Sequence, residues 1–469
     1  MSPVADMLPA SSAERVANPA IDLGTIDPKW AWGRYEPSAA TPWGVALAAH
    51  LFRRAGFGAT WKELQEACAR GPQASIDALL RQPAAYAAFA EEIDGHETAA
   101  ARSGDGMVFV AWWLRRLRQS PWPLLEKLTL FWHDYFAVRP APGGDWKLTY
   151  AHAQTLRKQA FGDFPALIGA LANDPAMYAG LGGDQNRKAR PNLHFARPWI
   201  EVFTVGSEAA SESAVANLAR AWTGWFLYGG KLRFIEREHD QESKSLLGRE
   251  GDWGRDDAVR MLAEDPATAG NVARRLFRAF VSESASPPDS LLAPIAERIA
   301  RKASLLEVLE MMLRSNLFFS GHAFGQRIKS PVELAIGLVR SLDGGLPSSV
   351  VGEELANLGQ RLDAPPTVHG WAGGVNWINT ISMAARLQLC ESLARGSGSF
   401  GPGLDPARVA VENGFKTPDS QVRFLFDLLL AGLLPDPAVR RITEAAAAAP
   451  QSMKAVLEMI IAQPEFQLS

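Results

Sequence analysis

Apolar residues recur at helical spacing along most of the chain, and helix caps and stops separate one run from the next. Residues 44–58, GVALAAHLFRRAGFG, end in two glycines, which are typical of a helix C-terminus. Residues 60–71 begin with Thr60 and carry Glu63 three positions later, which is the pattern of a capping box. Similar spacing follows at 107–120, 305–319 and 330–342. This pattern predicts a mainly α protein with a large multi-helix globular body.

The segment from residue 222 to residue 236, WTGWFLYGGKLRFIE, lacks helical spacing. Two short apolar runs flank Gly229 and Gly230 in it, which predicts a β-hairpin. We therefore expect one small β-hairpin in an otherwise helical protein.

Composition divides the chain into four parts. Residues 1–42 are rich in Pro, Ser and Ala, and we expect an extended N-terminal arm that its tryptophans hold against the body. The main helical body covers residues 43–395. A Gly-rich loop at residues 396–404 precedes a C-terminal helical segment, residues 405–469, which we expect to pack on the body.

Charge and hydropathy exclude several classes of partner. The 48 basic and 51 acidic residues give a net charge of −3, which predicts neither a nucleic acid partner nor an anionic membrane surface. No apolar run of about 18 residues occurs, so we expect no membrane span. The N-terminal residues lack the basic and apolar regions of a secretory signal. The sequence as written predicts a cytoplasmic protein, and export together with a partner stays open.

The first candidate site is FWHDYF, residues 131–136. The apolar residues around it follow helical spacing and form an aromatic stripe, and His133 lies at the border between this stripe and the polar side. A histidine at such a border can be a ligand or an acid–base group, because its pKa lies near neutrality. The alternative, which is the more frequent role, is a buried ring that is hydrogen-bonded to a carbonyl.

The second candidate site is RPNLHFARPWIEVF, residues 190–203. Asn192 is a plausible helix start, so Pro198 would lie in the second turn, where it frees the carbonyl of His194. Asn192 and His194 are therefore candidate ligand-binding residues. The freed carbonyl could equally bind one structural water.

Arg197 and Glu201 lie four residues apart in the same segment. They can form an ordinary surface ion pair, which stabilises a helix only slightly. Alternatively, both converge with His133 on a shared pocket, and the three would then be the catalytic residues of an enzyme.

A third candidate site follows the predicted hairpin, where His239, Asp240 and Lys244 occur within six residues of each other. An adjacent His-Asp pair with a nearby lysine could bind an anion or coordinate an ion. A solvated loop is the default interpretation, because the flanking residues are polar.

The fourth candidate site is TVHGWAGGVNWINT, residues 367–380. Trp371 and Trp377 offer flat walls on which a small molecule such as a carbohydrate could stack, and the next helix carries Arg386. The alternative is a tight corner that the two tryptophans hold in place.

These four segments, in this order, resemble the bacterial family called domain of unknown function 1800. The other matching pieces are HLFRRAGFG near residue 50, NDPAMYAGL at 173–181, ARAWTGW at 219–225 and KSPVELAIGLVRSL at 329–342. The match runs from roughly residue 45 to residue 465. Such proteins are largely helical and are frequently encoded beside a sulfatase-like family, domain of unknown function 1501, whose members often carry twin-arginine export signals. The resemblance therefore implies a sulfatase-like protein partner, and it leaves the cofactor and the oligomeric state unknown.

The chain departs from the family pattern at three polar positions. Where the family has His-x-His-Phe, Tyr135 replaces the second histidine. Where the family has Asn-Glu-Asn-[Phe/Tyr]-Ala-Arg-Glu-x-x-Glu, Leu193 and Pro198 replace two acidic residues. Histidines and carboxylates on two helices would suit a divalent metal, so the resemblance implies a metal site that this chain has partly lost. We therefore assign no metal ligand.

Two functions are compatible with these residues. The one that we favour is a non-catalytic binding or scaffold protein that docks the sulfatase-like partner and retains a degenerate ancestral pocket. It predicts a broad aromatic surface, for which 15 tryptophans are available. The alternative is a metal-assisted hydrolase or oxidoreductase that uses His133, Arg197 and Glu201 between helices.

Overall fold

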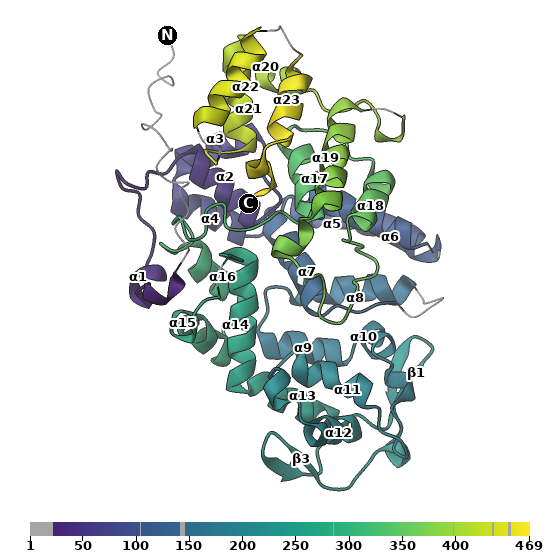
Figure 1. The fold of residues 1–469 in the computed structure, drawn as a ribbon. Helices are drawn as coiled ribbons and strands as arrows, with labels where there is room; N and C mark the ends of the chain where they lie inside the picture. The colour runs from purple at the N-terminus through teal and green to yellow at the C-terminus, as the bar shows by residue number, and fades with distance from the viewer. Residues whose placement is uncertain are drawn as a thin grey trace.

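The computed structural model describes residues 22–103, 105–140, 146–284, 286–396, 398–433, 436–448 and 452–469. Within these ranges the chain forms 23 α-helices and two small two-stranded antiparallel sheets, so the predicted mainly α class is confirmed. Figure 1 shows an elongated body, with helices α9 to α13 and both sheets in its lower half. Helices α2 to α4 and α17 to α23 occupy the upper half.

Six helices begin with a dipeptide of the same kind. Its first residue, an Asp, Ser or Thr, is the N-cap, and its second, a proline, is the first helical residue. Each N-cap side chain accepts a hydrogen bond from a backbone N–H of the first turn, and proline is tolerated there because its missing N–H needs no partner. These N-caps are Asp27, Asp174, Asp265, Ser330, Asp405 and Thr417. The starts of these helices are therefore encoded locally.

The described part of the N-terminal arm packs on the body through aromatic residues, whereas residues 1–21 of the predicted arm lie outside the described residues. The indole N–H of Trp32 donates to the carbonyl of Leu291 (2.7 Å), and that of Trp43 donates to the carbonyl of Ala67 (3.0 Å). Instead of running extended throughout, this region contains short helical turns. These turns are η2 (Leu23–Thr25) and α1 (Pro28–Ala31). The first helices of the main body follow as α2 (Val45–Arg54), α3 (Trp61–Arg70) and α4 (Pro72–Leu80).

Helix α7 (Pro123–Tyr135) lies near the middle of the body and is buried on nearly all sides. A helix can be buried in this way only when neighbouring elements surround it. The elements that pack on it include α4, α6 (Gly106–Gln119) and α8 (Trp146–Gln159), and α5 (Tyr86–Ser103) precedes α6.

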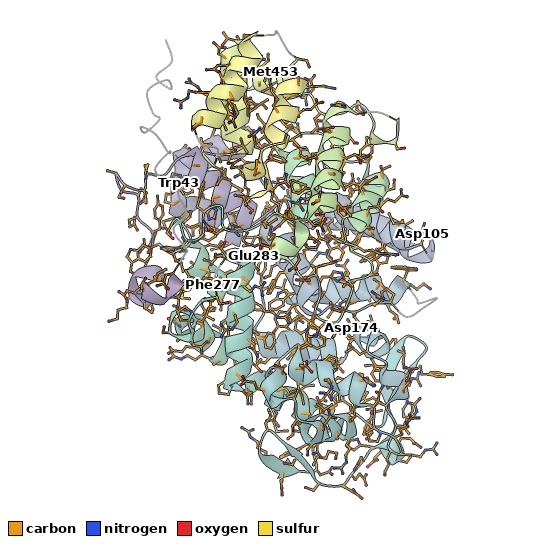
Figure 2. All side chains as sticks on the ribbon, in the orientation of Figure 1. Trp43, Asp105, Asp174, Phe277, Glu283 and Met453 are labelled. Atoms are coloured by element: carbon orange, nitrogen blue, oxygen red, sulfur yellow. The ribbon has the colours of Figure 1, made fainter. Side chains whose placement is uncertain are left out.

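In the lower half of the body, the helices lie between the two hairpins, with β1 at the right edge and β3 at the lower left (Figure 1). Figure 2 shows side chains filling the space between these elements, with Asp174 at the start of α10, beneath α8. The helices are α9 (Phe164–Ala172), α10 (Pro175–Gly180), α11 (Leu193–Glu201), α12 (Glu212–Ala221) and α13 (Arg255–Glu264).

The predicted hairpin is confirmed. Strands β1 (Trp225–Tyr228) and β2 (Lys231–Phe234) pair antiparallel, and Tyr228 lies opposite Lys231 across the turn. The two turn residues, Gly229 and Gly230, both have positive φ (56° and 73°), which glycine adopts without a steric penalty.

A second hairpin was not predicted from the sequence. Strands β3 (Lys244–Leu246) and β4 (Arg249–Gly251) pair antiparallel, so the β content exceeds the single hairpin that we expected. Its turn places Leu247 at φ 49° and Gly248 at φ 73°. Because leucine rarely adopts positive φ, a leucine at this position does not indicate a turn in the sequence.

The remaining helices complete the upper half and the left side of the body in Figure 1. The last residues of the chain return to its centre, where the backbone N–H of Lys329 donates to the carbonyl of Gln467 (2.8 Å). The elements are α14 (Pro266–Phe280), α15 (Asp289–Ala300), α16 (Leu305–Leu313), α17 (Pro331–Ser341), α18 (Ser348–Asn357), α19 (Thr380–Arg395), α20 (Pro406–Glu412), α21 (Pro418–Leu429), α22 (Asp436–Ala448), α23 (Met453–Ile461) and η8 (Pro464–Gln467).

Tryptophans do not form the broad aromatic surface that the sequence led us to expect. The largest fully buried side chains include Trp113, Trp132, Trp199 and Trp222, whereas Trp30 is 47% exposed. Burying an indole removes a large apolar area from water, and the helical body uses most of its tryptophans in this way. That expectation is therefore wrong.

Across the described ranges, no helix combines the length and the apolar character that crossing a bilayer requires.

Candidate functional site

His133 lies in the interior near the end of α7 and is only 2% exposed. Its Nε2 is 2.8 Å from the carbonyl oxygen of Leu362, and its ring contacts the edge of Trp113 at a centroid distance of 4.7 Å. Burial lowers the pKa of His133 to about 3, so the ring is neutral at pH 7. This geometry matches the alternative of a buried ring that is hydrogen-bonded to a carbonyl.

The tight corner after Leu362 is fixed to α7 by Asp134. The Oδ1 of Asp134 accepts the backbone N–H of Trp371 at 2.7 Å. Gly370 has φ 75°, and a Cβ at this position would lie 2.1 Å from that same Oδ1. Burial raises the pKa of Asp134 to about 6, and the Trp371 N–H opposes this rise. At Gly370 the corner therefore lies closer to α7 than a residue with a side chain would allow.

Asn192 caps helix α11 (Leu193–Glu201), in agreement with the helix start predicted from the sequence. The Asn192 side chain accepts the N–H of His194 (3.1 Å), and its amide donates to the carbonyl of Gly182 (3.0 Å). Pro198 lies inside the helix, and two backbone N–H groups, those of Val202 and Phe203, donate to its carbonyl. The side chain of His194 is exposed to solvent, whereas that of Asn192 is half-buried, so the two side chains lie in different surroundings.

Arg197 and Glu201 form the expected ion pair on the surface of α11, at 3.9 Å. Arg197 also pairs with Glu212 of α12. No hydrogen bond, ion pair or ring contact in the described part of the chain joins either residue to His133. The structure does not bring together the three residues of the enzyme hypothesis.

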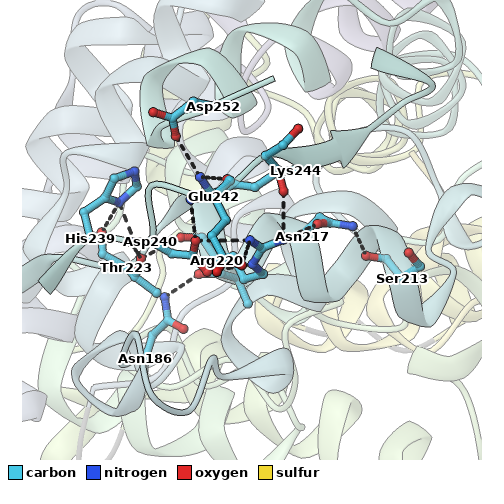
Figure 3. Close-up of polar contacts among 12 residues, drawn as sticks. Asn186, Ser213, Asn217, Arg220, Thr223, His239, Asp240, Glu242, Lys244 and Asp252 are labelled. Carbon is cyan, nitrogen blue, oxygen red and sulfur yellow. Dashed lines mark hydrogen bonds and ion pairs between the residues drawn. The ribbon is translucent and has the colours of Figure 1, made fainter. Parts of the chain in front are cut away.

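The segment with Asp240 is folded against α12 rather than solvated (Figure 3). Arg220 donates to both carboxylate oxygens of Asp240, at 2.7 and 3.1 Å. The hydrogen bond from Arg220 holds the pKa of Asp240 below its usual value. His239 lies 2.9 Å from the carbonyl of Thr223, whose hydroxyl accepts the Asp240 N–H.

Lys244 is also bound within the protein. Its Nζ donates to the carbonyl of Glu242 (3.0 Å) and to the carboxylate of Asp252 (3.1 Å), and its side chain is 1% exposed. The default interpretation as a solvated loop is therefore wrong for Asp240 and Lys244, because Asp240 pairs with Arg220 of α12 and Lys244 pairs with Asp252 beside the second hairpin.

The fourth candidate segment does not enclose Arg386. Trp371 is 7% exposed and its ring lies 5.8 Å from His133, whereas Trp377 is half-buried beside Gly359. Arg386 is fully buried on α19, where it donates to Gln467 and to the carbonyl of Lys329. Residues 367–380 therefore form the tight corner of the alternative interpretation. Arg386 belongs to a separate interior cluster.

The comparisons with known proteins assign the chain to one family. The model of the family described as protein of unknown function (DUF1800) matches residues 50–468, which is nearly the whole chain. The chain belongs to the DUF1800 family. No curated protein and no solved structure matches it.

The polar positions at which this DUF1800 chain departs from the family pattern have local roles in the structure. The hydroxyl of Tyr135 donates to the carbonyl of Phe203 just after α11 (3.2 Å), and Arg275 lies over its ring at 4.4 Å. Burial raises the pKa of Tyr135 to about 12, so the hydroxyl stays protonated. Leu193 packs against the core as the first residue of α11. This hydrogen bond of Tyr135 therefore joins α7 to the segment that follows α11.

Two functional candidates in this DUF1800 chain were not singled out from the sequence, although Asp174 lies in the NDPAMYAGL piece that matches the family. His152 and Asp174 are both buried, with Nδ1 and Oδ2 3.2 Å apart, and the His152 ring lies 6.3 Å from that of His133. His133 Nδ1 and His152 Nε2 have no hydrogen-bond partner. Among the described residues, however, no group of three or more His, Cys, Asp or Glu could hold a metal ion.

Proposed function

We propose that the protein is a non-catalytic binding protein that docks a sulfatase-like partner, with a degenerate ancestral pocket around His133. The observation that supports it best is an exposed aromatic and basic surface on the first hairpin. We call it the hairpin surface and define it by Phe226, Tyr228, Lys231 and Arg233, which share one face of the hairpin, with Arg187 beside it.

The hairpin surface combines apolar area with cations that lie over aromatic rings. Tyr228 is 69% exposed, and Phe226 is half-buried. Arg233 lies over the Tyr228 ring at 5.1 Å, and Arg187 lies over the Phe226 ring at 4.7 Å. Tyrosine and arginine are enriched among the residues that dominate binding energy at protein interfaces.

The charge around the hairpin surface favours an acidic partner segment. The exposed residues of the hairpin and of the neighbouring loop carry more basic than acidic side chains, although the chain as a whole has a net charge of −3. The basic residues are Arg187, Lys188, Arg190, Lys231, Arg233 and Arg237, and the acidic ones are Asp184, Glu236 and Glu238. An acidic segment would be attracted to this surface and would dock faster at low salt.

The interior around His133 supports the non-catalytic part of the proposal. The side chains that stand at the polar positions of the family pattern are engaged in structural contacts, His133 with Leu362 and Tyr135 with Phe203. Two imidazole nitrogens without partners fall short of the three protein ligands that a catalytic metal site uses.

Binding of the protein to a sulfatase-like protein of the domain of unknown function 1501 family tests the proposal. We expect the double substitution Phe226→Ala, Tyr228→Ala to weaken the affinity by about tenfold or more, because truncating aromatic side chains that the partner would cover removes about 1 to 2 kcal/mol each. Calorimetry or interferometry at two salt concentrations would measure this.

The matched control is Val411→Ala on α20, a residue that is 48% exposed in the opposite half of the body. We expect it to leave the affinity unchanged. Equal affinities for the double variant and the wild type, or no binding at all, would contradict the proposed docking function.

A further inference from the structure

The first hairpin has a free edge along β2. Among the described residues, β1 and β2 form a sheet of two strands, and no third strand pairs with either. The outer edge of β1 is covered near its start, because the hydroxyl of Tyr178 on α10 donates to the carbonyl of Trp225 (2.7 Å). Three of the four residues of β2 are exposed, and Figure 1 places the hairpin at the right edge of the body. Such an edge presents backbone donors and acceptors to solvent.

The register of the hairpin determines which backbone groups point outward. The N–H of Ile235 donates to the carbonyl of Gly224 (2.8 Å), so these two residues belong to a hydrogen-bonded pair. Hydrogen-bonded and non-hydrogen-bonded pairs alternate along an antiparallel ladder. Phe234 and Leu232 therefore belong to non-hydrogen-bonded pairs, and their N–H and C=O groups point away from β1. Among the described residues, no hydrogen bond from another element reaches these groups.

Two basic side chains on β2 restrict what can pair with this edge. Lys231 and Arg233 lie on the same face of the strand. A second copy of β2 would bring the same charges beside them, and like charges on neighbouring strands destabilise the pairing. A segment with acidic residues at alternate positions would instead place carboxylates beside both cations. Leu232 and Phe234 lie on the other face, where apolar side chains of the segment would meet them.

We propose that the free edge of β2 binds an extended acidic segment of the sulfatase-like partner, which adds to the hairpin as a third strand. This inference rests on the proposed docking function and specifies how the partner is held. The main chain of the segment exchanges hydrogen bonds with Leu232 and Phe234, which provides affinity. Its acidic residues pair with Lys231 and Arg233, and apolar residues alternate with them, which provides specificity.

Two substitutions of Leu232 separate the backbone contribution from that of the side chain. Leu232→Pro removes the outward N–H, and proline is tolerated on an edge strand where the N–H faces solvent. Leu232→Ala, the matched control, truncates the same side chain and keeps the N–H. We expect Leu232→Pro to weaken binding of the sulfatase-like partner at least about tenfold more than Leu232→Ala does, because an acceptor of the bound segment loses its donor. Calorimetry measures both affinities.

A synthetic peptide tests the edge without the partner and with wild-type protein alone. The probe has ten residues of alternating glutamate and valine, and we expect it to bind at low salt with a Kd below about 1 mM. Two further versions carry N-methyl groups at every valine or at every glutamate, so each lacks the N–H groups of one edge. One version should lose binding and the other should keep it, because only one edge of an added strand faces β2. No binding of the unmodified peptide, or equal affinities of the two methylated ones, would overturn the proposal.

The two assays distinguish strand addition from the docking function on which it rests. Partner binding that Leu232→Pro and Leu232→Ala weaken equally would overturn strand addition and leave the docking function intact. Peptide binding that is lost in Leu232→Pro, without any binding of the partner, would contradict the docking function and support strand addition at β2. A dimer that Leu232→Pro converts to a monomer in sedimentation would assign the edge to a second copy of the chain and overturn the proposal.

Discussion

Replacing Glu333 by glutamine is expected to destabilise the protein by about 3 to 5 kcal/mol, because it leaves two buried cations without their shared counter-ion. One carboxylate oxygen of Glu333 accepts from Lys127 and Arg327, and the other accepts the backbone N–H of Ser330 (2.8 Å) at the start of α17. The amide keeps the shape of the side chain but removes its charge. Urea unfolding of both proteins measures the difference.

The effect of Glu333→Gln should depend on pH. Lys127 and Arg327 hold the pKa of Glu333 far below its unfolded value of 4.5. A carboxylate with a lowered pKa contributes its stability above the unfolded value and loses it as the pH falls through the folded one. The difference between wild type and variant should therefore be full at pH 7 and shrink below about pH 4.5.

Glu63→Gln is the matched control for this substitution. Glu63 occupies the same third position of a capping box, on α3, and pairs with Arg340 at 2.6 Å. Its side chain is 35% exposed, so solvent screens the charge, and we expect a loss of about 1 kcal/mol or less. Similar losses for Glu63→Gln and Glu333→Gln would contradict the account of buried cations that share Glu333.

The second large effect is expected at Gly370. In Gly370→Ala the new Cβ would lie 2.1 Å from Oδ1 and 2.3 Å from the backbone oxygen of Asp134, at a residue with φ 75°. The backbone strain and the overlap together should cost about 3 kcal/mol or more. The corner would have to move away from α7, which breaks the hydrogen bond from Trp371 to Asp134.

Gly373→Ala separates the overlap from the strain. Gly373 lies in the same corner with φ 68°, but the atom nearest to a Cβ there is 4.0 Å away. We expect only the cost of its strained backbone (φ 68°, ψ −180°), about 1 to 3 kcal/mol. If urea unfolding shows that Gly373→Ala is as damaging as Gly370→Ala, the close approach of the corner to Asp134 is not what stabilises it.

Local sequence signals predicted the features that depend on neighbouring residues. Gly229-Gly230 marks the first hairpin and Asn192 caps α11, because caps and turns are determined within a few residues. The capping box from Thr60 to Glu63 was confirmed for the same reason.

Contacts between distant segments could not be predicted in this way. His133 meets a carbonyl 229 positions away, and Lys329 meets Phe466 137 positions away. One signal was available for buried cations, since the adjacent Arg53 and Arg54 in an otherwise apolar helix cannot both avoid the core. Which residues become the hydrogen-bond partners of these arginines depends on the tertiary fold. The spacing of residues along one helix does not determine it.

The central claim is that the interior around His133 is a structural element with too few donors to hold a metal firmly. Elemental analysis of protein purified without chelators tests it most directly. The account predicts less than about 0.1 equivalents of any transition metal, because two imidazole nitrogens alone do not complete a site. About one equivalent of metal that is lost on His133→Ala or His152→Ala would contradict it.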